Sequence, residues 1–158
     1  MSTAIVYASK HGTTAEIARR MTTRIGGNTT LFDLADGSPD LSPYSTVVLG
    51  TAIYAGQPKS DMKAFCRTVK LSGKRLGLFV CGMEQDPAKQ ATELANAFPK
   101  HLRKQAATEA FLAGRFLFSA MNLAERFITK RIAKTSQDVD SIDDDAITAF
   151  ASSLTGTE

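Results

Sequence analysis

Short apolar runs alternate with amphipathic segments along the chain, and each kind of segment predicts one kind of element. Five apolar runs predict strands at residues 3–8, 29–34, 45–50, 76–80 and 108–113. Between them, apolar residues that recur every three or four positions predict helices over residues 14–25, 59–69, 87–97 and 142–154. The run at 45–50 lacks polar alternation, so we expect this strand to lie at the centre of a sheet.

The alternation of strands and helices predicts an α/β fold, because parallel strands need a crossover connection and a helix supplies it. We expect three layers and a doubly wound, five-stranded parallel sheet in the order 2-1-3-4-5. In such sheets the ligand lies beyond the carboxyl ends of the strands where the order reverses, here after the first and third strands. We expect one domain over residues 1–158.

The segment between the first strand and the first helix has the composition of an anion-binding loop. Its residues are Ser9, Lys10, His11, Gly12, Thr13 and Thr14. Amide groups at a helix start lack intrahelical partners, and the helix dipole makes that end electropositive, so a phosphate there accepts several hydrogen bonds. A plain capped turn is the alternative, because Ser and Thr cap helices in general. The glycine-rich dinucleotide and P-loop patterns are missing, which disfavours nicotinamide enzymes and nucleotide hydrolases.

The pattern Ser-x-x-Gly-x-Thr at this turn resembles the FMN-phosphate loop of flavodoxins, which usually reads Thr/Ser-x-Thr-Gly-x-Thr. His11 stands where that loop commonly has Thr or Ser, so an imidazole replaces one hydroxyl contact. The resemblance implies a flavodoxin-like fold and FMN as the cofactor. It also implies that residues 9–14 hold the phosphate of FMN.

Two further loops would then frame the flat ring of FMN. Their residues are Thr51, Ala52, Ile53, Tyr54, Ala55 and Gly56 after the third strand, and Cys81, Gly82, Met83, Glu84 and Gln85 after the fourth. Tyr54 offers an aromatic face for stacking, and Gly56 permits a backbone conformation barred to other residues. The alternatives are a surface tyrosine that covers a loop and, for Cys81, a small apolar residue of the core.

A finer resemblance concerns two segments. Residues 50–56, Gly-Thr-Ala-Ile-Tyr-Ala-Gly, resemble the Gly-x-Ser-Ile-x-x-Gly loop of the flavodoxin-domain family that contains menaquinone-dependent protoporphyrinogen oxidase. Residues 125–130, Glu-Arg-Phe-Ile-Thr-Lys, resemble its Asp-Arg-Phe-Ile-x-Lys segment. The resemblance implies an oxidoreductase that passes electrons from a hydrophobic donor through FMN to a quinone. One departure is that Gln57 and Pro58 stand where the oxidase pattern has a His after the loop glycine.

Composition and net charge exclude few classes of binding partner. The 158 residues are 43% hydrophobic and 22% charged, which is typical of a globular protein and excludes long disorder and coiled coils. The formal net charge of +3 identifies no partner, and we expect no nucleic acid. Residues 115–134 combine cations with apolar residues at helical spacing. Such a segment contacts an anionic membrane surface, covers a hydrophobic substrate, or packs on the sheet as an ordinary helix.

Three functions remain open, all in a protein that we expect to be cytoplasmic. Cys66 and Cys81 are too few for a disulfide framework or a zinc site, and neither a charged leader nor a membrane-spanning stretch is evident. Peripheral contact with the inner face of the membrane through residues 115–134 is compatible with that location. The first function is an FMN-dependent oxidoreductase whose chemistry lies in the flavin, with no protein acid or base. The second is a flavodoxin-type electron carrier that serves a redox partner protein, although such carriers are usually acidic. The third is a scaffold of the same fold without a cofactor.

Overall fold

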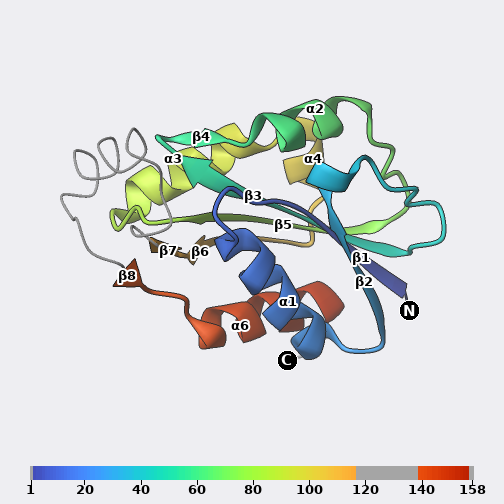
Figure 1. Ribbon diagram of the computed structural model, residues 1–158. Coiled ribbons are helices and arrows are strands. Elements are labelled where there is room, and N and C mark those ends of the chain that lie inside the picture. The colour runs from blue at the N-terminus through green and yellow to red at the C-terminus, as the bar shows by residue number, and fades with distance from the viewer. Residues whose placement is uncertain (1, 117–138, 157–158) are drawn as a thin grey trace.

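The five apolar runs form the five parallel strands of one sheet in a computed structural model, which describes residues 2–116 and 139–156 (Figure 1). These strands are β1 (Ser2–Ala8), β2 (Asn28–Asp33), β3 (Thr46–Tyr54), β5 (Arg75–Gly82) and β6 (Thr108–Ala113). Their order is β2-β1-β3-β5-β6, and a two-residue strand, β4 (Gln57–Pro58), pairs antiparallel with β3 outside this path. The predicted strand order 2-1-3-4-5 is therefore confirmed.

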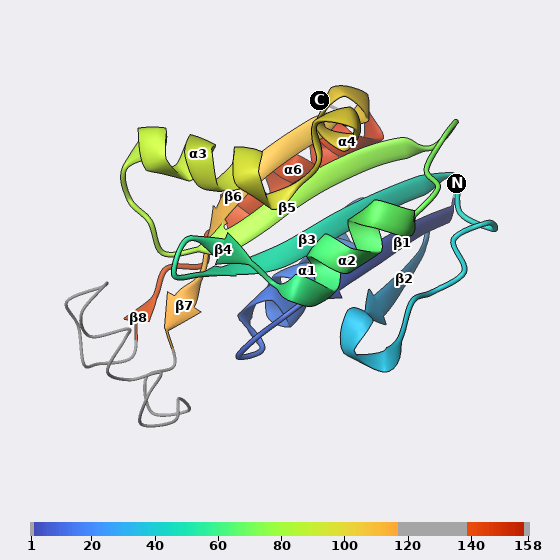
Figure 2. The ribbon, with the colours of Figure 1, turned by 90° about the horizontal axis from the view of Figure 1, so that it is seen from above.

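Helices cover both faces of the sheet and complete three layers (Figures 1 and 2). One face carries α1 (Thr13–Ile25) and α6 (Asp144–Thr155), and the other carries α2 (Ser60–Thr68), α3 (Pro87–Ala97) and α4 (Lys100–Gln105). Neighbouring residues of a strand point to opposite faces, so a strand covered on both sides is apolar throughout. In β1, Ile5 packs in the core beneath α1 and α6, whereas Val6 packs in the core beneath α2 and α4, and both are fully buried.

The segment after Gly50 differs from the loop that we expected there. β3 continues to Tyr54, because Thr51 and Ala52 pair with β5 and because Ile53 and Tyr54 pair with β4. The chain then reverses in a tight turn at Ala55 and Gly56, whose φ angles are 51° and 78°. This segment is therefore a β-hairpin that projects from the carboxyl end of β3, and only its turn is a loop.

Several short elements had no clear signal in the sequence. They are α4, the 3₁₀ turn Leu34–Asp36, and the antiparallel pair β7 (Arg115–Phe116) and β8 (Val139–Asp140). The first two residues of the basic amphipathic segment thus form a strand and not a helix. Its remaining residues, 117–134, lie outside the described residues, as does the 125–130 motif. No helix in the described part of the chain is both long and apolar enough to cross a membrane.

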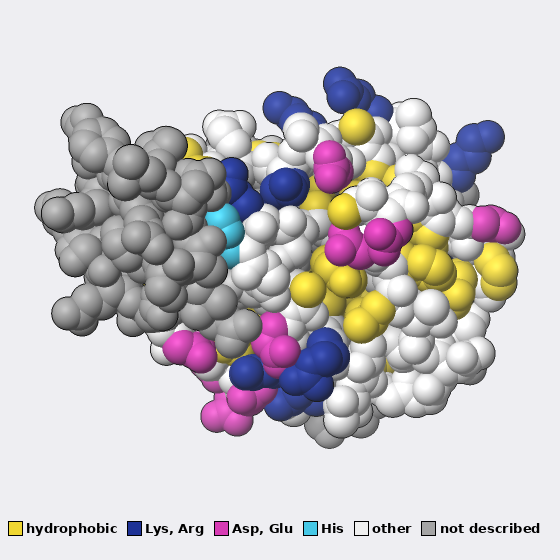
Figure 3. All heavy atoms as spheres, viewed as in Figure 1, with side chains coloured by type: hydrophobic (Ala, Val, Ile, Leu, Met, Phe, Trp, Pro, Cys, Tyr) yellow, Lys and Arg dark blue, Asp and Glu magenta, His cyan; other side chains and the backbone are white. Residues whose placement is uncertain are grey.

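Ion pairs join the two helices on the α1 face, where acidic and basic side chains gather (Figure 3). Glu16 and Arg20 of α1 pair at 2.9 Å, and Arg20 also reaches Asp144 at the start of α6, at 3.3 Å. Arg24 pairs with the same carboxylate at 2.7 Å. Asp144 therefore connects α6 to two successive turns of α1.

Candidate functional site

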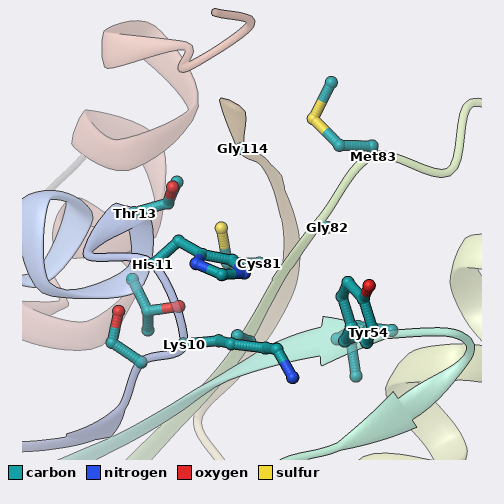
Figure 4. A pocket seen from close by; sticks show the side chains of 12 residues that line it. Lys10, His11, Thr13, Tyr54, Cys81, Gly82, Met83 and Gly114 are labelled. Carbon is teal, nitrogen blue, oxygen red and sulfur yellow. The ribbon is translucent and has the colours of Figure 1, made fainter. Parts of the chain in front are cut away.

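A cavity opens at the carboxyl ends of β1, β3 and β5, where the strand order reverses between β1 and β3 (Figure 4). The cavity is open to solvent on one side, and its volume of about 50 Å³ takes a group the size of a few water molecules. Its lining residues are Ser9, Lys10, His11, Thr13, Thr14, Ala52, Ile53, Tyr54, Cys81, Gly82, Met83 and Gly114. The structure therefore brings together three segments that the sequence had placed at one site.

The β1–α1 loop is shaped by Gly12, which occupies the N-cap position of α1 in the left-handed conformation, with φ 85°. A residue with a side chain is disfavoured there. The amide of Gly12 donates a hydrogen bond to Ser9 Oγ at 3.0 Å, which closes the loop on itself. No side chain caps α1 at this position. The electropositive start of the helix therefore faces the cavity without a carboxylate or hydroxyl cap.

The hydroxyl group of Thr14 is buried at the same helix start. Thr14 is fully buried, and its Oγ1 has no hydrogen-bond partner among the residues that the structure describes. A buried hydroxyl without a partner costs free energy, so such a group in a native structure calls for an explanation. Because Thr14 lines the cavity, a ligand with acceptor oxygens would supply the missing partner.

Tyr54 joins the hairpin to the β1–α1 loop. The ammonium group of Lys10 lies 4.3 Å from the centroid of the Tyr54 ring, and the His11 ring meets the same ring edge-on with centroids 6.5 Å apart. Directly after Tyr54, Ala55 adopts a positive φ, which costs an L-residue about 1–2 kcal/mol. The turn that holds Tyr54 at the cavity is therefore strained.

Six expected site residues do not line the cavity: Gly12, which shapes the loop, and five others, Thr51, Ala55, Gly56, Glu84 and Gln85. Thr51 is fully buried, and its Oγ1 accepts a hydrogen bond from the amide of Lys59 at 3.1 Å, so it anchors the start of α2. Ala55 and Gly56 form the turn of the hairpin. Glu84 accepts hydrogen bonds from the amides of Gln85 and Asp86, and these residues lead into α3.

Gly114 lines the cavity, although it was not among the expected site residues. Its amide donates a hydrogen bond to the carbonyl of Gly82 at 2.9 Å, and a Cβ atom placed on it would meet Cys81 and Thr13. The available signal was a glycine placed directly after the predicted fifth strand, at the edge of the sheet where the other site segments end. A side chain at this position would enter the space between β5 and α1.

The cavity suits an anion better than it suits acid–base chemistry. Its described lining residues include Lys10 and the imidazole of His11 but no carboxylate. Among the described residues, no group of three or more His, Cys, Asp or Glu side chains is placed to hold a metal ion. Burial places Cys81 with the core residues of the α1 face. The arrangement can therefore bind and orient an anionic ligand, while the chemistry itself must come from that ligand.

Comparison with solved structures finds the same fold at low sequence identity, and no curated protein matches the chain. A short-chain flavodoxin associated with a PDU bacterial microcompartment is 17% identical, covers 99% of this chain and 98% of its own, and has a TM-score of 0.65. The flavodoxin of Streptococcus pneumonia TIGR4 is 15% identical over 99% of both chains, with a TM-score of 0.60. The Fusobacterium nucleatum flavodoxin bound to flavin mononucleotide is 16% identical over 70% of both chains, with a TM-score of 0.51.

These likenesses show the fold alone, whereas the family is shown by the sequence itself. The family model of the flavodoxin domain matches residues 4–143, which include the five parallel strands, except for the first two residues of β1, and the three segments of the cavity. The chain therefore belongs to the flavodoxin domain family.

Proposed function

We propose that this protein binds FMN noncovalently and transfers electrons through it. The observation that carries the proposal is the start of α1, where the left-handed Gly12 leaves the helix without a side-chain cap and the Thr14 hydroxyl is buried without a partner. A phosphate monoester offers several acceptor oxygens to such a site. The flavodoxin domain family supports FMN as the source of that phosphate, and the Fusobacterium nucleatum flavodoxin is bound to it.

Different residues of the cavity would contact different parts of FMN. The cavity is of a size for the phosphate end of FMN, which the amides opening α1 and the hydroxyl groups of Ser9, Thr13 and Thr14 would hold. Tyr54 and Met83 line the same cavity and would contact the flat rings. When bound, FMN supplies a ring system that accepts and releases electrons. The protein contributes the position of that ring and the charge around it.

Titration of the protein with FMN tests the proposal. FMN fluorescence changes on binding, and riboflavin, which lacks the phosphate, serves as the matched ligand. We expect FMN to bind at least tenfold more tightly than riboflavin, because only FMN engages the start of α1. If the protein binds neither compound at micromolar concentrations, the proposal fails and the cofactor-free scaffold remains.

The finer part of the proposal is an oxidase-like activity, in which electrons pass from a hydrophobic donor such as protoporphyrinogen through FMN to a quinone. It is supported by the resemblance of residues 50–56, which form the end of β3 and the hairpin turn at the cavity. Turnover of protoporphyrinogen with a menaquinone analogue would distinguish this enzyme from a carrier. A carrier would exchange electrons only with a redox partner protein and would show no turnover above background.

Peripheral contact with a membrane through residues 115–134 belongs to the same proposal, because a quinone is a membrane-dissolved acceptor. The support is the pattern of cations and apolar residues in that segment. Co-sedimentation with vesicles rich in anionic lipid tests it. Binding that is equal for neutral and anionic vesicles would contradict the electrostatic part.

A further inference from the structure

We propose that Lys10 favours the reduced form of bound FMN over the oxidised form and thereby raises its reduction potential. This inference rests on the proposed FMN function and adds a role for one side chain within it. Lys10 belongs to the loop that we expect to hold the phosphate, yet its ammonium group lies against the ring of Tyr54 on the hairpin.

The position of that ammonium group is the first observation. Lys10 is an exposed residue of the β1–α1 loop. Its Nζ lies 4.3 Å from the centroid of the Tyr54 ring, and Figure 4 shows the side chain running from the loop toward Tyr54. The negative face of an aromatic ring attracts a cation at this distance. The ring of Tyr54 is therefore one of the contacts that position the Lys10 ammonium group.

The charges around this pair are the second observation. The other titratable side chains lining the cavity are His11 on the loop, Tyr54 on β3 and Cys81 on β5. No carboxylate is among the described lining residues, and the nearest one along the chain, Glu84, accepts hydrogen bonds from two backbone amides. The described lining therefore places a cation, and no described carboxylate, beside Tyr54.

Reduction of FMN adds a negative charge to its rings. An external reductant such as dithionite or a reduced viologen gives two electrons, and the ring takes up these electrons with one proton. The reduced ring then carries one net negative charge that the oxidised ring lacks. A cation at the ring end stabilises this charged product more than the neutral reactant, which raises the potential.

The test compares wild type with Lys10→Gln, using Lys10→Arg and Lys70→Gln as matched variants. Lys70 is exposed and precedes β5, at the opposite edge of the sheet from the cavity. Affinity for oxidised and for reduced FMN is measured together with the reduction potential. We expect Lys10→Gln to weaken binding of reduced FMN three- to tenfold more than binding of oxidised FMN, and a tenfold difference corresponds to about 30 mV for two electrons. Lys10→Arg and Lys70→Gln should keep the wild-type potential.

Riboflavin and salt separate this role from a contact with the phosphate. If Lys10 acts on the ring, the Lys10→Gln shift persists with riboflavin, and it shrinks at high ionic strength because the Debye length falls to about 3 Å at 1 M. Equal weakening of oxidised and reduced FMN, or an unchanged potential, would overturn the inference while leaving FMN binding intact. Failure of the wild type to bind FMN would instead overturn the proposed function, and this inference with it.

Discussion

Gly114 and Cys81 lie so close together that no side chain fits between them. A Cβ atom placed on Gly114 would lie 2.7 Å from Cys81 Sγ and 3.3 Å from Thr13 Cγ2. The amide of Gly114 also donates to the carbonyl of Gly82, which ties the end of β6 to the end of β5. This glycine therefore lets three elements of the cavity wall meet: β5, β6 and the start of α1.

The close contact predicts that Gly114→Ala destabilises the protein by about 1–3 kcal/mol, the usual cost of overpacking. Affinity for FMN should fall as well, because the displaced atoms line the cavity. Urea unfolding and FMN titration measure the two effects. The double variant with Cys81→Ala removes the obstructing sulfur, so it should recover about 1 kcal/mol relative to the sum of the single variants. Strict additivity would show that the contact with Cys81 is not the cause.

Thr14→Val and Thr51→Val should change stability in opposite directions. The Thr14 hydroxyl is buried without a partner, so its replacement by a methyl group should stabilise the ligand-free protein by about 1 kcal/mol. Thr51 Oγ1 accepts from the Lys59 amide, so Thr51→Val leaves that amide unpaired and should cost about 1 kcal/mol. Urea unfolding without FMN measures the change in the free energy of unfolding for both variants.

The Thr14→Val variant also separates the effect on stability from the effect on FMN binding. Thr14→Val should weaken FMN binding about tenfold, because the hydroxyl group donates to the phosphate in our proposal. Riboflavin affinity should stay the same. If Thr14→Val destabilises the ligand-free protein, the hydroxyl has a structural partner and its proposed role toward phosphate fails.

The left-handed Ala55 predicts that Ala55→Gly stabilises the protein. The left-handed conformation costs an L-residue about 1–2 kcal/mol. Glycine removes this cost but lowers the stability by about 0.4–1 kcal/mol, because it increases the conformational entropy of the unfolded chain. We expect a net gain of about 0.5 kcal/mol in the free energy of unfolding. Ala91→Gly is the control, since Ala91 is exposed within α3 and should lose about 1 kcal/mol. A loss in both variants would show that the turn is unstrained.

The sequence predicts the sheet well because each central strand is apolar on both faces and each crossover contains a helical repeat. The predicted bounds of β6 and α3 match those observed, and Pro87 and Pro99 bracket α3 as expected of residues that begin or follow a helix. β3 was predicted too short because its last four residues include polar and small side chains. Their pairing with β4 and β5 is tertiary and leaves no local pattern.

The candidate site is predictable in outline for a related reason. The carboxyl ends of parallel strands meet at one edge, so the three segments had to converge, and the structure brings them together. The contact between Lys10 and Tyr54 joins residues 44 positions apart, and the role of Gly114 depends on a sulfur atom of another strand. Neither relationship follows from local spacing.

Acid should weaken the ion pairs within α1 that involve Glu16. Hydrogen bonds from Arg19 and Arg20 lower the pKa of Glu16 from its ordinary value of 4.5 to about 2. The carboxylate therefore adds stability above pH 4.5, and this contribution is lost as the pH falls from 4.5 to 2. The pairs are partly exposed, so we expect Glu16→Gln to cost at most about 1 kcal/mol at pH 7.

The pH dependence of the stability difference between wild type and Glu16→Gln is the sharper test. Glu93, in the same chain, should show a pH dependence of opposite sign. The stability gap between wild type and Glu16→Gln should close between pH 4.5 and 2 in urea unfolding. Burial and, to a smaller extent, the neighbouring Glu84 raise the pKa of Glu93, so the charged form of that side chain is disfavoured in the fold. Wild type should therefore lose stability relative to Glu93→Gln as the pH rises above 4.5. Parallel curves for the two variants would mean that neither carboxylate is coupled to folding as the contacts require.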